Sequence, residues 1–237
     1  MRTIGLIGGM SWESTAEYYR LLNEFTRERR GGLHSARCVL YSLDFAEIEE
    51  LQVQGRWEES ADILGAAAAS LEKAGADMVL ICTNTMHKVA DQVQAAVTVP
   101  LLHLADATAE AVCAAGISRV ALLGTVFTME QDFYRARLEA YGLEVMVPDA
   151  DARAVVHRII YEELCLGIVK EESRKEYSRV IDALAEDGAE GVILGCTEIE
   201  LLVRQEDSSV RVFPTTRLHA EAAVEAALAT SEQAARP

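Results

Sequence analysis

Short runs of apolar residues alternate along this chain with longer segments whose apolar positions recur at helical spacing. Glycine or polar residues bound each run, which is typical of strands buried on both faces of a parallel sheet. Strands are predicted at Thr3–Gly8, Cys38–Leu43, Met78–Cys82, Pro100–Leu104, Val120–Gly124, Leu143–Val147, Val192–Gly195 and Val210–Phe213. In the second half of the chain, long helices are predicted at Met129–Tyr141 and Asp151–Asp187. Ser14 and Glu17 have the spacing of a capping box at the start of the first helix. Strands that alternate with helices predict an α/β fold.

The strand pattern occurs twice, most clearly in the segments GADMVLICTNT and GAEGVILGCTE. Aligned without gaps, these segments place Thr83 opposite Cys196. Two similar strand ends predict two pseudo-symmetric α/β domains, each an open parallel sheet flanked by helices, with the active site in the cleft between them. The first predicted domain comprises residues 1–105 and the C-terminal helix, about 216–237. The second comprises residues 106–215.

Cys196 is the first candidate for chemistry, because it follows a predicted strand at the carboxyl end, where ligands bind in open α/β sheets. A helix is predicted to begin just after it, and the positive N-terminal end of a helix lowers the pKa of a thiol. Cys196 is thus an acid/base group or a nucleophile, or alternatively a buried structural cysteine. Cys82 directly precedes Thr83, so the side chains of these two residues point to opposite sides of the strand. We therefore expect Cys82 to lie in the core.

The composition argues against several kinds of partner and cofactor. A net charge of −16 over 237 residues disfavours nucleic acid and anionic membranes, because binding to phosphate depends on Lys and Arg. The five cysteines form no CxxC pair, the sequence does not open on a leader-like pattern, and no apolar run has the length of a membrane span. A reduced, cytoplasmic protein is expected. The histidines lack the spacing of a zinc site, and GLIGGM does not match the glycine fingerprint for dinucleotides, so we expect neither a metal nor any other cofactor.

Three motifs, IGLIGGMSWEST, CTNTMH and GCTEIEL, resemble those of the aspartate/glutamate racemase family, whose members are cofactor-independent amino-acid racemases. The resemblance covers nearly the whole chain. It implies two similar α/β domains with an amino-acid substrate in the cleft, and a homodimer. It also implies two catalytic cysteines, one in a Cys-Asn-Thr motif and one in a Cys-Thr motif, which flank the α-carbon of the substrate. Inversion without a cofactor requires a base and an acid on opposite faces.

The resemblance assigns roles to particular residues. Cys196 matches the second catalytic cysteine, and Thr83 stands where the first is expected. Glu198 is expected to orient the thiol or to receive the ammonium group of the substrate; a favourable acid in the first turn of a helix is the alternative. The remaining substrate-binding candidates are polar or wall-lining residues of the motifs, some of which could also cap helices. They are Met10, Ser11, Asn84, Thr85 and Thr197.

A thiol on only one side of the substrate predicts that the rate of catalysis depends on which enantiomer is the starting substrate. By resemblance, Cys196 removes the proton from the L-enantiomer, so L-aspartate or L-glutamate is the favoured substrate. Two alternatives remain at this point: a decarboxylase or isomerase of the same superfamily that uses a single cysteine, and a non-catalytic protein that binds a small acid.

Overall fold

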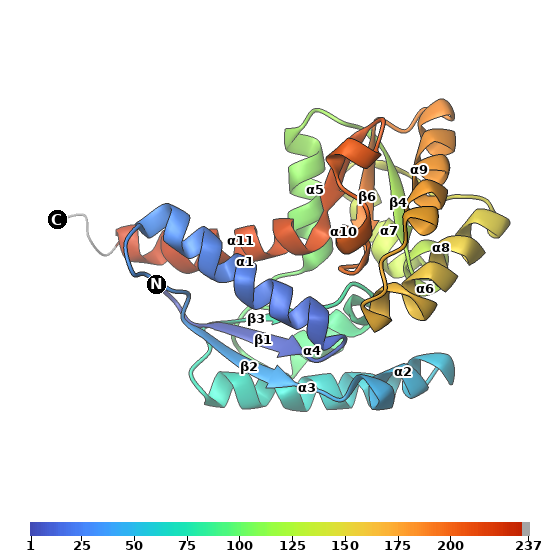
Figure 1. Cartoon of the computed structure of the whole chain (residues 1–237). Coiled ribbons are helices and arrows are strands. Elements are labelled where there is room, and N and C mark those ends of the chain that lie inside the picture. Colours follow the sequence, from blue (N-terminus) through green and yellow to red (C-terminus); the bar gives the residue numbers. More distant parts are fainter. Residues whose placement is uncertain (234–237) are drawn as a thin grey trace. The chain divides into compact units, whose positions relative to one another are not determined.

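The computed structural model describes residues 1–233 and forms two compact units (Figure 1). The first unit comprises Met1–Leu104 and the chain from His219 onward, and the second comprises Ala105–Leu218. Residues 234–237, which the sequence analysis includes in the last helix, lie outside the described residues.

The first unit is built on a parallel sheet of three strands with β1 in the middle, in the order β2-β1-β3. Alternate residues of β1 face two different hydrophobic clusters. Leu6 packs with α1 and α11, whereas Ile7 packs with α3 and α4. The sheet is therefore covered on both faces, as Figure 1 shows for α1 on one side and α3 on the other. The bounds are β1 Ile4–Gly8, α1 Trp12–Arg30, β2 Cys38–Ser42, α2 Phe45–Val53, α3 Trp57–Lys73, β3 Met78–Ile81, the 3-10 helix η1 Thr85–Val89, α4 Ala90–Ala95 and α11 Thr215–Gln233.

The second unit contains a parallel sheet of four strands in the order β5-β4-β6-β7. One face of β4 and β6 packs against α8 and α9 through a cluster that includes Leu123, Leu194, Ile160 and Tyr177. The bounds are α5 Leu104–Ala114, β4 Arg119–Gly124, α6 Val126–Glu130, α7 Asp132–Glu139, β5 Glu144–Met146, α8 Ala150–Glu162, η2 Leu164–Leu166, α9 Glu171–Glu186, β6 Gly191–Gly195, α10 Ile199–Leu202, η3 Gln205–Asp207 and β7 Arg211–Pro214. The predicted α/β class, with two parallel sheets flanked by helices, is confirmed.

The strand predicted at Pro100–Leu104 is wrong. Only an isolated bridge between Leu101 and Val79 forms there. Helix α5 begins already at Leu104, whose backbone N–H donates to the ring of His87 at 3.2 Å. Pro100 has no N–H to contribute to a ladder, which further weakens the segment as a strand.

Both long predicted helices are broken. The segment Asp151–Asp187 is divided at Gly167, which adopts a left-handed conformation with a φ of 70°. Beyond this turn the chain folds back, and the hydroxyl of Ser173 donates to the buried carboxylate of Glu163 at 2.5 Å. The segment Met129–Tyr141 is divided by an extended residue, Gln131.

The first helix begins earlier than the capping-box pattern suggests. Ser11 is its N-cap, and the Ser11 side chain accepts a hydrogen bond from the backbone N–H of Ser14. The hydroxyl of Ser14 donates instead to the carbonyl oxygen of Cys82. The predicted cap at Ser14 is therefore wrong, because a contact distant in sequence occupies its side chain.

Candidate active site

The first half-site lies at the carboxyl ends of β1 and β3, which pair in parallel with Ile7 opposite Ile81. The turn after β1 depends on Thr15, whose hydroxyl accepts from the backbone N–H of Gly9 and donates to the carbonyl of Ser11, both at 2.8 Å. Gly8 is required for this packing, because a Cβ there would lie 2.5 Å from the Cγ2 atom of Thr15. The turn that carries Ser11 is thus fixed to the first turn of α1.

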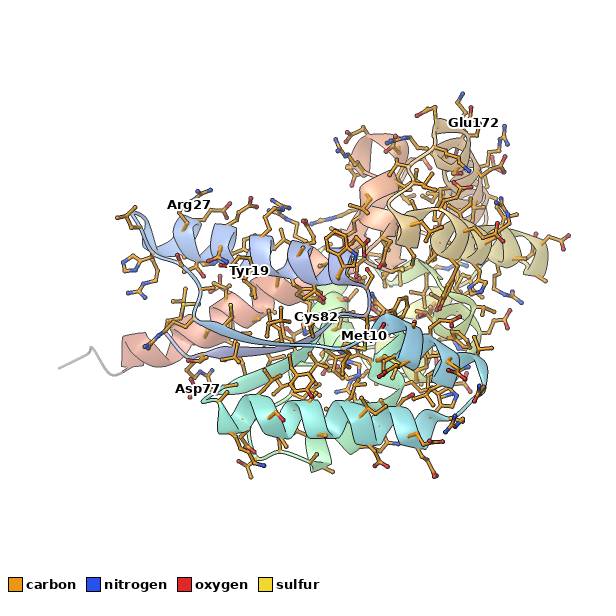
Figure 2. The ribbon with its side chains drawn as sticks, turned by 60° about the horizontal axis from the view of Figure 1, so that its bottom comes forward. Met10, Tyr19, Arg27, Asp77, Cys82 and Glu172 are labelled. Atoms are coloured by element: carbon orange, nitrogen blue, oxygen red, sulfur yellow. The ribbon has the colours of Figure 1, made fainter. Side chains whose placement is uncertain are left out.

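Met10 and Ser11 are both buried at this turn. Met10 belongs to the hydrophobic cluster on the α3 side of the sheet, whereas Cys82 belongs to the cluster on the α1 side. Figure 2 shows the two labelled residues at the same end of the sheet. Burial raises the pKa of the Cys82 thiol well above its ordinary value. Cys82 is a core residue, as its place in the strand predicted.

Thr83 follows Cys82 and is partly exposed, although the residues around it are buried. Asn84 and Thr85, the other candidates of this motif, are 3% and 5% exposed and lie at the start of η1. Because β1 and β3 are adjacent parallel strands, Thr83, Asn84 and Thr85 lie at the same end of the sheet as Ser11, the end formed by the carboxyl ends of the strands.

The second half-site lies at the carboxyl ends of β4 and β6, which pair with Gly124 opposite Gly195. Neither glycine can carry a side chain without displacing the backbone. A Cβ on Gly124 would lie 2.9 Å from the carbonyl oxygen of Gly195, and one on Gly195 would lie 2.9 Å from that of Leu123. This close approach places Thr125, the N-cap of α6, and Cys196 directly after neighbouring strand ends.

Cys196 has a specific partner in Glu198. The thiol donates to the Oε2 atom of Glu198 at 2.9 Å, and the two residues are 8% and 6% exposed. Thr197, between them, is also buried. A buried thiol bonded to a buried carboxylate is a pair between which a proton can pass.

The expectation that a helix lowers the pKa of Cys196 is wrong. The helix after it, α10, has only four residues and begins at Ile199. Burial, followed by the negative charge of Glu198, raises the pKa of the Cys196 thiol well above its ordinary value. A raised pKa favours the protonated thiol, in keeping with its hydrogen bond to Glu198, and a base is needed to make it a thiolate.

Cys165 also raises the pKa of the Cys196 thiol through its charge, and the sequence analysis did not single it out. Cys165 lies in η2 and packs against the same hydrophobic cluster as Cys196. The break in the predicted helix at Gly167 brings it there, and no local pattern indicates this.

Replacing Glu198 with glutamine should make Cys196 more reactive toward iodoacetamide. The substitution removes the negative charge that raises the pKa of the thiol, so a larger fraction is thiolate at a given pH. We expect a several-fold increase in the alkylation rate near neutral pH, measured by mass spectrometry of the Cys196 peptide. Glu186→Gln, an exposed change on α9, is the control and should leave the rate unchanged. Slower alkylation in Glu198→Gln would contradict the electrostatic role of Glu198.

The stability of the protein should fall at high pH. Burial raises the pKa of Cys82, Tyr134 and Tyr177 above their ordinary values. The unfolded chain ionises these groups at ordinary values, about 8.5 for cysteine and about 10 for tyrosine. The contribution of these groups to the free energy of unfolding is therefore fully present below about pH 8.5. Above that pH the free energy of unfolding decreases by about 1.4 kcal/mol per pH unit for each group that is ionised only in the unfolded chain. Urea unfolding at several pH values measures the decrease. The decrease in unfolding free energy with pH should be less steep in Cys82→Ala than in the unmodified protein. An equal steepness in both would contradict the burial of this thiol.

Within residues 1–233, no three side chains among His, Cys, Asp and Glu are grouped so that they could hold a metal ion. A search of the same residues for helices finds none with the length and apolar character needed to span a membrane.

The structure is that of an α/β protein with a thiol, Cys196, just after a strand of one parallel sheet and a hydroxyl, Thr83, just after a strand of the other. Comparison with known proteins identifies its family. The family model for Asp/Glu/Hydantoin racemase matches residues 7–223. The chain is 23% identical to the broad specificity amino-acid racemase RacX of Bacillus subtilis over 95% of this chain and 98% of the relative.

Solved structures agree with this match. A Yersinia pestis protein provisionally described as an Asp/Glu racemase is 57% identical, with a TM-score of 0.90 over 96% of this chain and all (100%) of the other. An aspartate racemase homologue from Pyrococcus horikoshii is 41% identical, with a TM-score of 0.84 over 96% of this chain and 99% of the other.

The protein belongs to the Asp/Glu/Hydantoin racemase family. The resemblance inferred from the three motifs is thereby confirmed, and membership places the protein among the amino-acid racemases, which are isomerases.

Proposed function

We propose that the protein racemises aspartate or glutamate without a cofactor, with Cys196 as the base for the L-enantiomer and Thr83 in place of a second thiol. The observation that carries this proposal is the asymmetry of the two strand ends. Cys196 is buried and bonded to a carboxylate, whereas the equivalent position of the repeat, Thr83, carries a partly exposed hydroxyl.

The proton transfers of this reaction balance when Cys196, Glu198, Thr83 and solvent are counted together. Glu198 accepts the thiol proton, and the thiolate of Cys196 then removes the α-proton, so that the Cα–H bond breaks and an S–H bond forms. The electron pair left on Cα is delocalised into the α-carboxylate. A proton reaches the opposite face from the hydroxyl of Thr83 or from a water molecule bound to it, and Glu198 returns its proton through solvent to that side.

Binding roles follow from the chemistry of the motif residues. Hydroxyl and amide groups suit the α-carboxylate of an amino acid, which assigns Asn84, Thr85 and Thr197 to it. Met10 and Ser11 are assigned to the wall of the substrate site. Glu198 faces the ammonium group, whose positive charge would also favour ionisation of Cys196.

The range of amino acids that the enzyme accepts could extend beyond aspartate and glutamate. RacX, the relative from Bacillus subtilis, is named for broad specificity. We further propose a cytoplasmic homodimer that binds neither nucleic acid nor a membrane surface, in keeping with the net charge of −16.

Incubation of the pure protein with each L-amino acid, followed by chiral chromatography, tests the proposal. The expected result is D-aspartate or D-glutamate. A decarboxylated product would favour the single-cysteine alternative, and binding without solvent exchange of the α-proton would favour a non-catalytic protein.

A further inference from the structure

Thr83 lies beyond the last residue of β3, Ile81, so the sheet ladder does not extend to it. Buried side chains bind the carbonyl groups on both sides of it. The carbonyl of Cys82 accepts from the hydroxyl of Ser14 at 2.9 Å, and the carbonyl of Thr83 itself is 2.8 Å from the Nδ1 atom of His87. Both peptide planes that flank Thr83 are therefore fixed by side chains.

The proton position on His87 follows from its second partner. The backbone N–H of Leu104 approaches Nε2 at 3.2 Å, and a backbone N–H can only donate. Nε2 must then carry a lone pair, so Nδ1 carries the proton and donates it to the carbonyl of Thr83. The ring of His87 is thus a neutral bridge between Thr83 and the first residue of α5.

Other rings hold the ring of His87 in place. His87 is 3% exposed, and its ring centroid lies 4.6 Å from that of His103 and 5.8 Å from that of His219. His219 is itself fixed, because its two nitrogens contact the hydroxyl of Tyr18 at 2.8 Å and the carbonyl of Leu102 at 2.9 Å. Rotation of His87 away from Thr83 would disturb this whole buried group.

The thiol side of the repeat is supported differently. The carbonyl of Cys196 accepts from the backbone N–H of Ile199 at 3.1 Å, a contact within its own turn. The carbonyls on the two sides of Thr83 are instead bound by side chains, that of Ser14 on α1, distant in sequence, and that of His87, four residues further on in η1. A hydroxyl is a weak acid, so its contribution to proton transfer depends strongly on position, and a misplacement of about 1 Å can cost about 100-fold in rate.

We propose that Ser14 and His87 are positioning residues that fix Thr83 so that a proton reaches the face of the substrate opposite Cys196. This inference rests on the proposed racemase function and extends it to residues that do not contact the reacting atoms.

Two substitutions of His87 separate its two hydrogen bonds. The side-chain amide of His87→Asn can replace Nδ1 and still donate to Thr83, but it cannot reach Leu104. The longer amide of His87→Gln can replace Nε2 and accept from Leu104, but it loses the bond to Thr83. Ser14→Ala removes the other bond and serves as a second variant if His87→Gln fails to fold. Ser60→Ala is the matched control, since Ser60 is equally buried in α3 and donates to Arg56.

The readout is a ratio that does not depend on how much protein is folded. L-aspartate is incubated in deuterated water, and the rate of D-aspartate formation is divided by the rate of deuterium incorporation into the recovered L-aspartate. We expect His87→Gln and Ser14→Ala to lower this ratio by about fivefold or more. His87→Asn and Ser60→Ala should stay within about twofold of the unmodified protein.

An unchanged ratio in both His87→Gln and Ser14→Ala, with normal exchange and inversion in the unmodified protein, would overturn the positioning role alone. Absence of exchange in the unmodified protein would overturn the racemase function, and the positioning role with it. The two failures are therefore distinguishable.

Discussion

Replacing Cys196 with serine should lower the rate of α-proton exchange from L-aspartate by about 10³-fold. The serine hydroxyl is smaller than the thiol, but it is the conservative replacement that can still donate to Glu198 in the buried site. A hydroxyl is far harder to ionise than a thiol, however, and the base that removes the α-proton is lost. Proton NMR in deuterated water measures the exchange, with circular dichroism as a check on folding.

Cys82→Ala is the control for this prediction. Cys82 is fully buried in the cluster with Leu6, Leu80 and Tyr18, so its removal should cost about 1 to 2 kcal/mol of stability. Exchange from L-aspartate should remain within about threefold of the unmodified protein. If Cys82→Ala loses as much exchange as Cys196→Ser, then Cys82 is the second base and the role assigned to Thr83 is wrong.

Replacing Thr83 with cysteine should raise the rate of α-proton exchange from D-aspartate by at least about tenfold, and more than that from L-aspartate. Thr83 is partly exposed, unlike Cys82, so a thiol at this position would not suffer the same desolvation. It would supply the second thiol that the motif of the family contains. Exchange, measured separately from each enantiomer, is the suitable quantity. For the overall inversion, kcat/KM must be equal in both directions, because the enantiomers have equal free energies.

The double variant Thr83→Cys with Cys196→Ser sharpens this prediction. It moves the single thiol from one strand end to the other, so the preference in exchange should change from the L- to the D-enantiomer. A double variant that still exchanges L-aspartate faster than D-aspartate would show that the two positions do not serve opposite faces.

The fold could be predicted from the sequence wherever the signal was local and repeated. Apolar runs bounded by glycine identified β1, β3, β4 and β6, and the similarity of GADMVLICTNT to GAEGVILGCTE indicated that the chain contains two related sheets. Predictions failed where a distant contact decides the local structure. Glu163 and Ser173 interrupt what reads as one long helix, and the bond between Leu104 and His87 ends the segment predicted as a strand.

In the candidate site, too, local sequence signals predicted some features, whereas features that depend on distant contacts could not be predicted. The alternation of side chains along a strand was enough to place Cys82 in the core beside Thr83. The environment of Cys196 was not predictable in this way, since the helix behind it proved to be four residues long and the dominant effect on its pKa is burial. Ser14 and His87 lie in the motifs IGLIGGMSWEST and CTNTMH, but the motifs do not show that these side chains bind the carbonyls on the two sides of Thr83. Ser14 is 68 residues away from Cys82, whose carbonyl it binds.

The central claim, that one thiol and one hydroxyl serve the two faces of an amino acid, is tested most directly on the unmodified protein. L-aspartate and D-aspartate are incubated separately in deuterated water, and the initial rate of α-proton exchange is followed for each by NMR. The account predicts exchange from L-aspartate with appearance of the D-enantiomer, and slower exchange from D-aspartate at saturating concentration. Equal saturated exchange rates from both enantiomers would contradict the asymmetry, and absence of exchange from aspartate, glutamate and the other amino acids would contradict racemisation itself.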